Sequence, residues 1–192
     1  MCGIIGYTGR KEAQPILLEG LHRLEYRGYD SAGLAVNGPS GLTIMKRAGS
    51  VEELERAVAL VRPLQGSSGI AHTRWATHGR PSDANAHPFT DCTGKIAIAH
   101  NGIIENHARL REALKAEGHV FRSETDTEVL VVVVKHGDEP GVLVGARREN
   151  PLVLGVGEGE MFFASDVPAL IRHTRRVVYL EDGEVARITP QG

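Results

Sequence analysis

The second residue of the chain, Cys2, is the side chain best suited to covalent chemistry. If Met1 is removed, Cys2 carries two reactive groups, a thiol with a pKa of about 8.5 and an α-amine with a pKa of about 8. That amine can take the proton of its own thiol, so the nucleophile needs no separate histidine. A cysteine beside Ile4 and Ile5 is also an ordinary small core residue, and its position alone leaves both interpretations open.

Three other polar segments offer groups that complement such a nucleophile. Arg27, followed by Gly28, provides a fixed cation that can lie near the chain start. Arg74 follows a predicted strand and suits a carboxylate, because a guanidinium forms paired hydrogen bonds with it. Asn101 and Gly102 also follow a strand. A side-chain amide beside an unobstructed backbone N–H suits a developing oxyanion.

A fourth segment contains Asp126, which admits two interpretations. Its carboxylate can hold an ammonium group, or it can stabilise the start of a helix through the helix dipole. Taken together, the segments provide a thiol nucleophile, an oxyanion hole, an arginine for a carboxylate and an aspartate for an amine. They predict a site for an α-amino acid whose side chain carries a cleavable acyl group.

The elements that must position these groups are a mixture of strands and helices. Helical spacing or a capping box predicts helices from residue 15 to 24, from 50 to 61, and through Leu110 and Leu114 to Gly118. The turn-rich segment 37–41 predicts a hairpin between residues 34–36 and 42–44, and buried strands are predicted at 70–71 and 96–99. Strands dominate after Gly141, at 142–144, 152–154, 161–163, 177–180 and 185–188. This order predicts an α+β architecture of stacked sheets flanked by helices.

One segment gives conflicting signals. Thr125 and Glu128 form a capping box that predicts a helix, whereas residues 131–134 are four consecutive valines that favour a strand. No Gly, Pro or Asn separates the two. The sequence therefore predicts either a very short helix or chain missing near Leu130, and we favour the second interpretation.

Composition indicates one globular domain. The chain has 192 residues, of which 41% are hydrophobic and 24% charged, the usual mix for a folded domain. A net charge of −2 gives no electrostatic footprint for nucleic acid. The longest aliphatic run is too short to cross a membrane, and the first residues lack a secretory pattern. With two cysteines and no disulfide framework, we expect a cytoplasmic protein.

The nine histidines raise a different class of function, a zinc-binding module. Four of them, His72, His78, His87 and His100, lie near one another in the sequence. Structural zinc sites usually contain close pairs such as Cys-x-x-Cys, and this chain has no such cysteine pair. The sequence therefore does not favour a metal site.

Six motifs in order resemble the class II glutamine amidotransferases. More narrowly, they resemble the glutaminase domains of the glutamine–fructose-6-phosphate aminotransferases, or glucosamine-6-phosphate synthases. Tyr29 and Trp75 favour this subfamily over the similar amidophosphoribosyltransferases, which remain an alternative. The motifs span essentially the whole chain, at residues 2–6, 27–33, 72–79, 85–88, 100–106 and 123–128.

The resemblance implies a four-layer αββα N-terminal-nucleophile (Ntn) hydrolase fold over residues 1–192. It also implies that Cys2 attacks the side-chain amide of L-glutamine, releases ammonia and forms a thioester that water hydrolyses to glutamate. A form that retains Met1 would lack the basic amine and is expected to be almost inactive. A catalytically silent glutamine sensor with the same pocket is a further alternative.

Site roles carried over from the resemblance fall on matching positions of this sequence. Asn101 and the Gly102 N–H would hold the oxyanion, and Arg27 would orient the chain start. Arg74 would bind the α-carboxylate of glutamine, and Asp126 would bind its α-ammonium group. The pocket would be lined by Trp75, Thr77, His78 and His87. No metal or organic cofactor is implied.

Two departures from the family are visible. The family carries an extra helix and strand between the Asp126 segment and the strand near Leu152, where the local signals conflict. Full-length synthases continue into sugar-phosphate isomerase domains, and this chain stops at Gly192. We therefore expect fructose-6-phosphate to be reached only through those absent domains, free ammonia to be the product here, and the full-length enzyme to be a homodimer.

Overall fold

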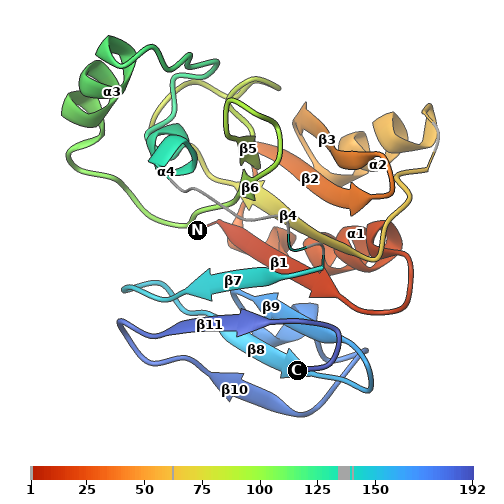
Figure 1. Ribbon diagram of the computed structural model, residues 1–192. Helices are drawn as coiled ribbons and strands as arrows, with labels where there is room; N and C mark the ends of the chain where they lie inside the picture. The colour runs from red at the N-terminus through yellow and green to blue at the C-terminus, as the bar shows by residue number, and fades with distance from the viewer. Residues whose placement is uncertain (1, 62, 134–138, 140) are drawn as a thin grey trace.

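The computed structural model describes residues 2–61, 63–133, 139 and 141–192 of the chain (Figure 1). Its centre is a seven-stranded sheet in which every neighbouring pair is antiparallel. Its strands, in spatial order, are β10 (Val177–Tyr179), β8 (Val153–Val156), β9 (Met161–Ala164), β1 (Gly3–Thr8), β4 (Ser68–Arg74), β2 (Ser31–Gly38) and β3 (Gly41–Ala48). The strand that begins just after Cys2 is therefore central and has a partner on each side.

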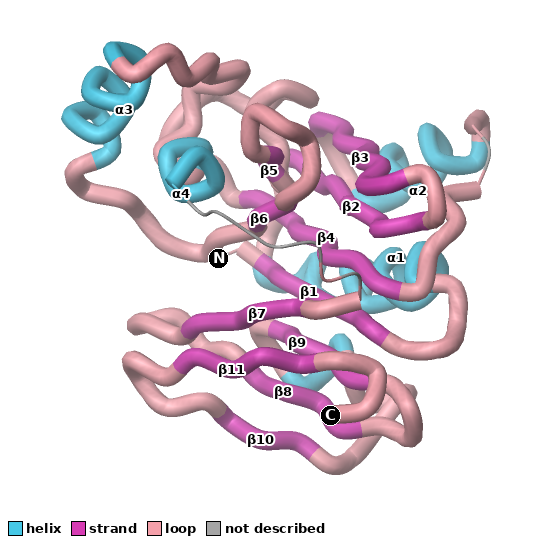
Figure 2. Tube along the Cα trace, in the orientation of Figure 1, coloured by secondary structure: helices cyan, strands magenta, loops and turns pink. Residues whose placement is uncertain are grey.

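One face of this sheet is covered by helices α1 (Ala13–Leu24) and α2 (Val51–Ala59) (Figure 2). Ile5 and Tyr7 of β1 lie in the same buried cluster as Leu17 and Leu21 of α1, and all four are fully buried. The predicted capping box of α2 is confirmed, because the Ser50 and Glu53 groups bond reciprocally. This helix–sheet core forms the first two layers.

The opposite face packs on a two-stranded ribbon of β7 (Leu143–Ala146) and β11 (Val185–Ile188). Side chains alternate across the main sheet, so Phe162 points to the helix side and Phe163 to the ribbon side. A second ribbon joins β5 (Phe89–Thr90) to β6 (Ala97–Ile98), and α4 (Glu128–Val133) packs on it beside α3 (His107–Ala116). The layer order is helix, sheet, sheet, helix, as expected for an Ntn fold.

Most sequence-predicted elements are present. The hairpin is longer than predicted, because β2 and β3 pair as far as Gly38 and Gly41. Two short 3₁₀ turns are also present, at Glu25–Arg27 and Val167–Ala169. The predicted buried strand at 96–99 is reduced to the two half-buried residues of β6. The strand is shorter because its first residue takes part in a turn. The carboxylate of Asp91 accepts hydrogen bonds from the backbone N–H groups of Lys95 and Ile96, which holds residues 91–96 in that turn.

The segment with conflicting signals forms the six-residue helix α4 up to Val133. The predicted capping box between Thr125 and Glu128 is wrong. The Glu128 carboxylate instead accepts hydrogen bonds from the backbone N–H groups of Arg122 and Ser123, at 2.7 and 2.9 Å. Residues 134–138 lie outside the described residues, so missing chain near Leu130 stays a prediction. Among the residues that are described, no helix is long and apolar enough to span a membrane.

Candidate active site

Cys2 lies at the start of the central strand β1, where three other segments meet it. Its Sγ atom accepts a hydrogen bond from the backbone N–H of Trp75 at 3.2 Å. Its carbonyl oxygen accepts one from Arg27 Nε and one from Asn101 Nδ2, each at 3.2 Å. Burial raises the pKa of the Cys2 thiol, whereas the Trp75 N–H acts in the opposite direction. The thiol is thus held in place and favours its protonated form.

Arg27 reaches the Cys2 carbonyl from the short turn that follows α1. Its Nη1 forms an ion pair with Asp166 Oδ2 at 3.2 Å, and the Arg27 side chain is almost fully buried. The next residue, Gly28, has a φ of +97°, and a Cβ there would lie 2.6 Å from the Trp75 ring. Only glycine fits this close approach, so the backbone next to Arg27 can lie against the Trp75 ring while both residues contact Cys2.

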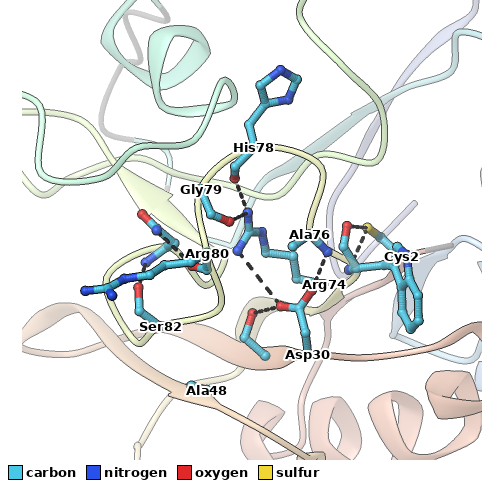
Figure 3. A network of polar contacts seen from close by, with 12 residues as sticks. Cys2, Asp30, Ala48, Arg74, Ala76, His78, Gly79, Arg80 and Ser82 are labelled. Carbon is cyan, nitrogen blue, oxygen red and sulfur yellow. Dashed lines mark hydrogen bonds and ion pairs between the residues drawn. The ribbon is translucent and has the colours of Figure 1, made fainter.

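Arg74 ends β4 and organises the loop that follows it (Figure 3). Its Nη2 donates to the backbone carbonyls of His78 and Gly79, the latter at 2.8 Å. Its Nη1 lies 3.9 Å from Asp30 Oδ1, and among the described residues Nη1 makes no hydrogen bond. Asp30 also accepts the backbone N–H of Ala76. Arg74 as a whole is 3% exposed, so Nη1 is a buried donor that faces the Asp30 carboxylate without a hydrogen bond among the described residues.

Asn101 is oriented by a histidine. Its Oδ1 lies 3.1 Å from Nε2 of the fully buried His72. Because an amide oxygen only accepts, Nε2 of His72 carries the proton. Burial lowers the pKa of His72 to about 3, so the ring is neutral. His87 stacks on His72 with ring centroids 4.2 Å apart, and burial lowers its pKa well below the usual range.

Gly102 follows Asn101 with a φ of +146°. A Cβ on this glycine would lie 2.9 Å from His100 Nε2, so a larger residue would collide with that ring. The Asn101 carbonyl accepts a hydrogen bond from Asn150 Nδ2 at 2.9 Å. This contact joins the segment that contains Asn101 and Gly102 to the loop between β7 and β8, which the sequence analysis did not connect with the site.

Asp126 is 4% exposed and links two loops. Its Oδ2 accepts the backbone N–H of Ile104 at 2.7 Å, and α4 begins two residues later at Glu128. The carboxylate therefore holds the segment that follows Gly102 in place. Its role toward an ammonium group stays a prediction.

The remaining predicted residues differ in their exposure and contacts. Trp75 is 56% exposed and Thr77 is exposed, while His78 packs edge-on against His107 with ring centroids 4.8 Å apart. The structure thus brings Arg27, Trp75 and Asn101 directly to Cys2, and places His87 behind Asn101. Of the residues the sequence analysis missed, Asp30 and His72 lie inside the recognised motifs, whereas Asn150 carries no sequence signal.

Two surface cavities lie away from Cys2. One, of about 490 Å³, borders the outer side of α1 and includes Glu19, His22 and Arg172. The other, of about 680 Å³, is lined by residues such as Arg10 and Arg176. In the part of the chain that the structure describes, no group of three or more His, Cys, Asp or Glu side chains is placed to hold a metal ion.

Comparison with known proteins shows the class of protein to which this chain belongs. Residues 63–143 match the family described as "Glutamine amidotransferase domain". The fold is similar to that of a glutamine phosphoribosylpyrophosphate amidotransferase from B. subtilis, with a TM-score of 0.83 and 27% identity over 100% of this chain and 48% of that one. A structure titled as the allosteric regulatory enzyme of purine biosynthesis gives a TM-score of 0.84, also at 27% identity. Fold and site together define an Ntn-type glutamine amidotransferase domain.

Curated relatives with a similar sequence show to which family of glutamine amidotransferases the chain belongs. The chain is 53% identical to a glutamine–fructose-6-phosphate aminotransferase (isomerizing) of Thermus thermophilus, over 100% of this chain and 36% of that protein. It is 47% identical to the protein of the same name in Thermococcus kodakarensis, over 98% of this chain and 36% of the relative. The chain belongs to the glutaminase domains of the glutamine–fructose-6-phosphate aminotransferase family.

The chain spans about a third of the length of these relatives. The alignment with the Thermus protein is 219 residues long, although this chain has 192 residues. That relative therefore carries residues that have no counterpart in this chain.

Proposed function

We propose that this chain hydrolyses the side-chain amide of L-glutamine to glutamate and ammonia, with Cys2 as the nucleophile. The observation that carries the proposal is the convergence of Trp75, Arg27 and Asn101 on Cys2 at 3.2 Å each. A half-buried cysteine in a merely structural role does not require a buried arginine and an oriented amide on its carbonyl.

The first step concerns the thiol proton. Burial raises the pKa of the Cys2 thiol, so a base must remove the proton before the sulfur can attack. In the processed chain the α-amine of Cys2, with a pKa of about 8, is that base. If Met1 is retained, this nitrogen is an amide and cannot accept a proton. Removal of Met1 is therefore part of the proposal.

The second step forms and breaks bonds at the carboxamide carbon of glutamine. The sulfur attacks this carbon, and the carbonyl electrons move to the oxygen, where Asn101 Nδ2 and the Gly102 N–H stabilise the charge. An amide NH₂ has two hydrogens, so Asn101 Nδ2 can keep its hydrogen bond to the Cys2 carbonyl and also donate one to the oxyanion. The ammonium of Cys2 returns its proton to the leaving NH₂ group, ammonia departs, and water hydrolyses the thioester.

Two buried charges would fix the amino-acid part of the substrate. Nη1 of Arg74 is the donor proposed for the α-carboxylate, since Nη2 already holds the loop. Asp126 is proposed for the α-ammonium group, and the bond from the Ile104 N–H to its Oδ2 would hold the carboxylate in place. Trp75, Thr77, His78 and His87 are proposed to line the pocket.

The reaction that consumes the ammonia would take place in a longer protein. We propose that it serves the synthesis of glucosamine-6-phosphate from fructose-6-phosphate, because the relatives that match over the whole chain carry that aminotransferase name. The sugar phosphate would be bound by isomerase domains outside these 192 residues, in a homodimer. Both cysteines are free thiols, which fits a cytoplasmic protein.

Ammonia release from L-glutamine tests the proposal. The chain with Met1 removed, verified by mass, should release ammonia, whereas Cys2→Ala and the form that retains Met1 should not. Cys92→Ala is the matched control, because Cys92 is the other free cysteine and is exposed. Glutamine binding without turnover would favour the sensor. Equal release by the wild type and Cys2→Ala would overturn the enzyme assignment.

A further inference from the structure

The loop between β7 and β8 contributes one side chain to the segment that contains Asn101 and Gly102. Asn150 Nδ2 donates to the backbone carbonyl of Asn101 at 2.9 Å, across 49 positions of sequence. Nothing in the motifs around Cys2 includes this loop. Asn150 is half-buried and lies within the described part of the chain.

The bonded carbonyl belongs to the same peptide group as the Gly102 N–H. A peptide group is planar, and in the trans form its C=O and N–H point in opposite directions. A donor that holds the Asn101 oxygen therefore also sets the direction of the Gly102 N–H, which faces away from Asn150. The other oxyanion donor is set in the same manner, because His72 holds Oδ1 of Asn101 and turns Nδ2 toward Cys2.

Asn150 is itself held by an unusual backbone conformation. Glu149 has a φ of +65°, a left-handed conformation that a residue with a side chain seldom adopts. The backbone N–H of Glu149 donates to Asp182, in the turn between β10 and β11. The neighbouring Arg147 pairs with the same turn through the backbone of Gly183 and Glu184. The loop is thus tied down on one side and presents Asn150 on the other.

We infer that Asn150 is a positioning residue for the oxyanion hole, acting through the Asn101 carbonyl to aim the Gly102 N–H at the developing charge. This inference rests on the proposed glutaminase function. Asn150 touches no reacting atom. Its contribution should appear in the chemical step, because the oxyanion forms only there, and leave glutamine binding nearly unchanged.

Three replacements of Asn150 separate hydrogen bonding from packing. Asn150→Asp keeps the shape but places an acceptor against the Asn101 carbonyl, Asn150→Ala removes the group, and Asn150→Ser keeps one donor. We expect Asp to lower kcat at least as much as Ala, by about 10- to 100-fold with KM within about threefold, and Ser to lie between Ala and the wild type. Asn37→Asp is the matched control, at the opposite end of β2 from the Ser31–Arg74 pair.

Each outcome supports or contradicts the inference. If Asn150→Asp retains wild-type kcat, or if KM rises while kcat is unchanged, the inference is wrong. Circular dichroism shows whether Asn150→Asp folds. If it does not, kcat of Asn150→Ser is compared with kcat of Asn150→Ala instead, and equal kcat values for these two variants contradict the inference. Cys2→Ala is assayed in the same series. Ammonia release by Cys2→Ala at the wild-type rate overturns the proposed function itself, whatever the Asn150 variants do.

Discussion

The two halves of the candidate site are built in different ways. Cys2 and Arg74 lie at the ends of β1 and β4, where continuous antiparallel pairing sets their positions, from Gly3 opposite Thr73 onward. Asn101 and Gly102 lie in a loop held to the rest of the molecule by single side-chain contacts, from His72 and Asn150. The proposed nucleophile is therefore at the end of a strand of the sheet, and the proposed oxyanion donors are on a loop.

This difference separates stability from activity. A strand residue is fixed by many backbone hydrogen bonds, so a change that disturbs it should first destabilise the fold. A loop residue held by one or two side chains can lose its orientation while the fold persists. The two halves should thus respond differently to single substitutions, and four measurements address that comparison.

The largest expected effect is on the loop half. Asn101→Ala should lower kcat for glutamine hydrolysis by about 10²- to 10³-fold, the usual cost of removing one oxyanion donor. The chain should remain folded at 25 °C. Asn106→Ala is the control from the same segment, because Asn106 precedes α3 without a side-chain capping bond. Unchanged kcat in Asn101→Ala would remove the loop half from the chemistry.

A substitution in the sheet half should cost stability instead. Gly33 of β2 faces the loop that contains His87, and a Cβ on Gly33 would lie 2.2 Å from the His87 carbonyl oxygen. Gly33→Ala should lower the free energy of unfolding by about 3 kcal/mol, as expected for overpacking against rigid backbone. Urea denaturation measures this. Gly41→Ala, which meets no atom within 4 Å but has a φ of +97°, should cost only about 1 kcal/mol. Equal losses in the two variants would contradict the steric argument.

Acid should weaken the junction between the halves. Burial lowers the pKa of His72 to about 3 and lowers that of His87, so both are neutral in the folded state. Above the unfolded pKa of about 6.5, protonation of these histidines does not reduce the free energy of unfolding. As the pH falls from about 6.5 toward 3, the free energy of unfolding decreases, because only the unfolded chain binds the protons. For His72 the loss at pH 5 is about 2 kcal/mol.

Urea denaturation of the wild type and His72→Gln at pH 7, 6 and 5 measures this dependence. The glutamine can still donate to Asn101, but it does not titrate. Its stability should therefore fall less steeply with acid than that of the wild type. Identical slopes would show that His72 does not bind a proton on unfolding.

The smallest expected effect concerns the loop that carries Asn150. Glu149→Gly relieves the left-handed conformation at φ +65° and keeps the backbone N–H that binds Asp182. It should raise the free energy of unfolding by about 0.5 kcal/mol. Arg148→Gly, one residue earlier in the same loop, should lower it by a similar amount, since there glycine only adds freedom to the unfolded chain. Thermal denaturation compares the two, and the same sign for both would argue against strain at Glu149.

Local sequence signals accounted for the regular elements. The capping box at Ser50, the apolar spacing of α1 and the hairpin of β2 and β3 act over a few residues, so they can be recognised without a structure. The capping box at Thr125 was misleading, because Glu128 bonds to the backbone of Arg122 and Ser123 instead. Competition between near and distant partners is not visible in a spacing pattern.

The residue types of the site, a cysteine at the second position and the arginine, asparagine and aspartate segments that follow, could be recognised in the order of the amino acids. Their chemistry depends on functional groups, which the sequence states directly. Which groups meet was decided by the folded chain, where Asp30 lies beside Arg74, His72 orients Asn101, and Asn150 holds the Asn101 carbonyl. These contacts join segments 29 to 49 residues apart, and in two cases they depend on the direction of one hydrogen bond. No local periodicity encodes such a direction, because it is set by the packing of layers that are distant in sequence.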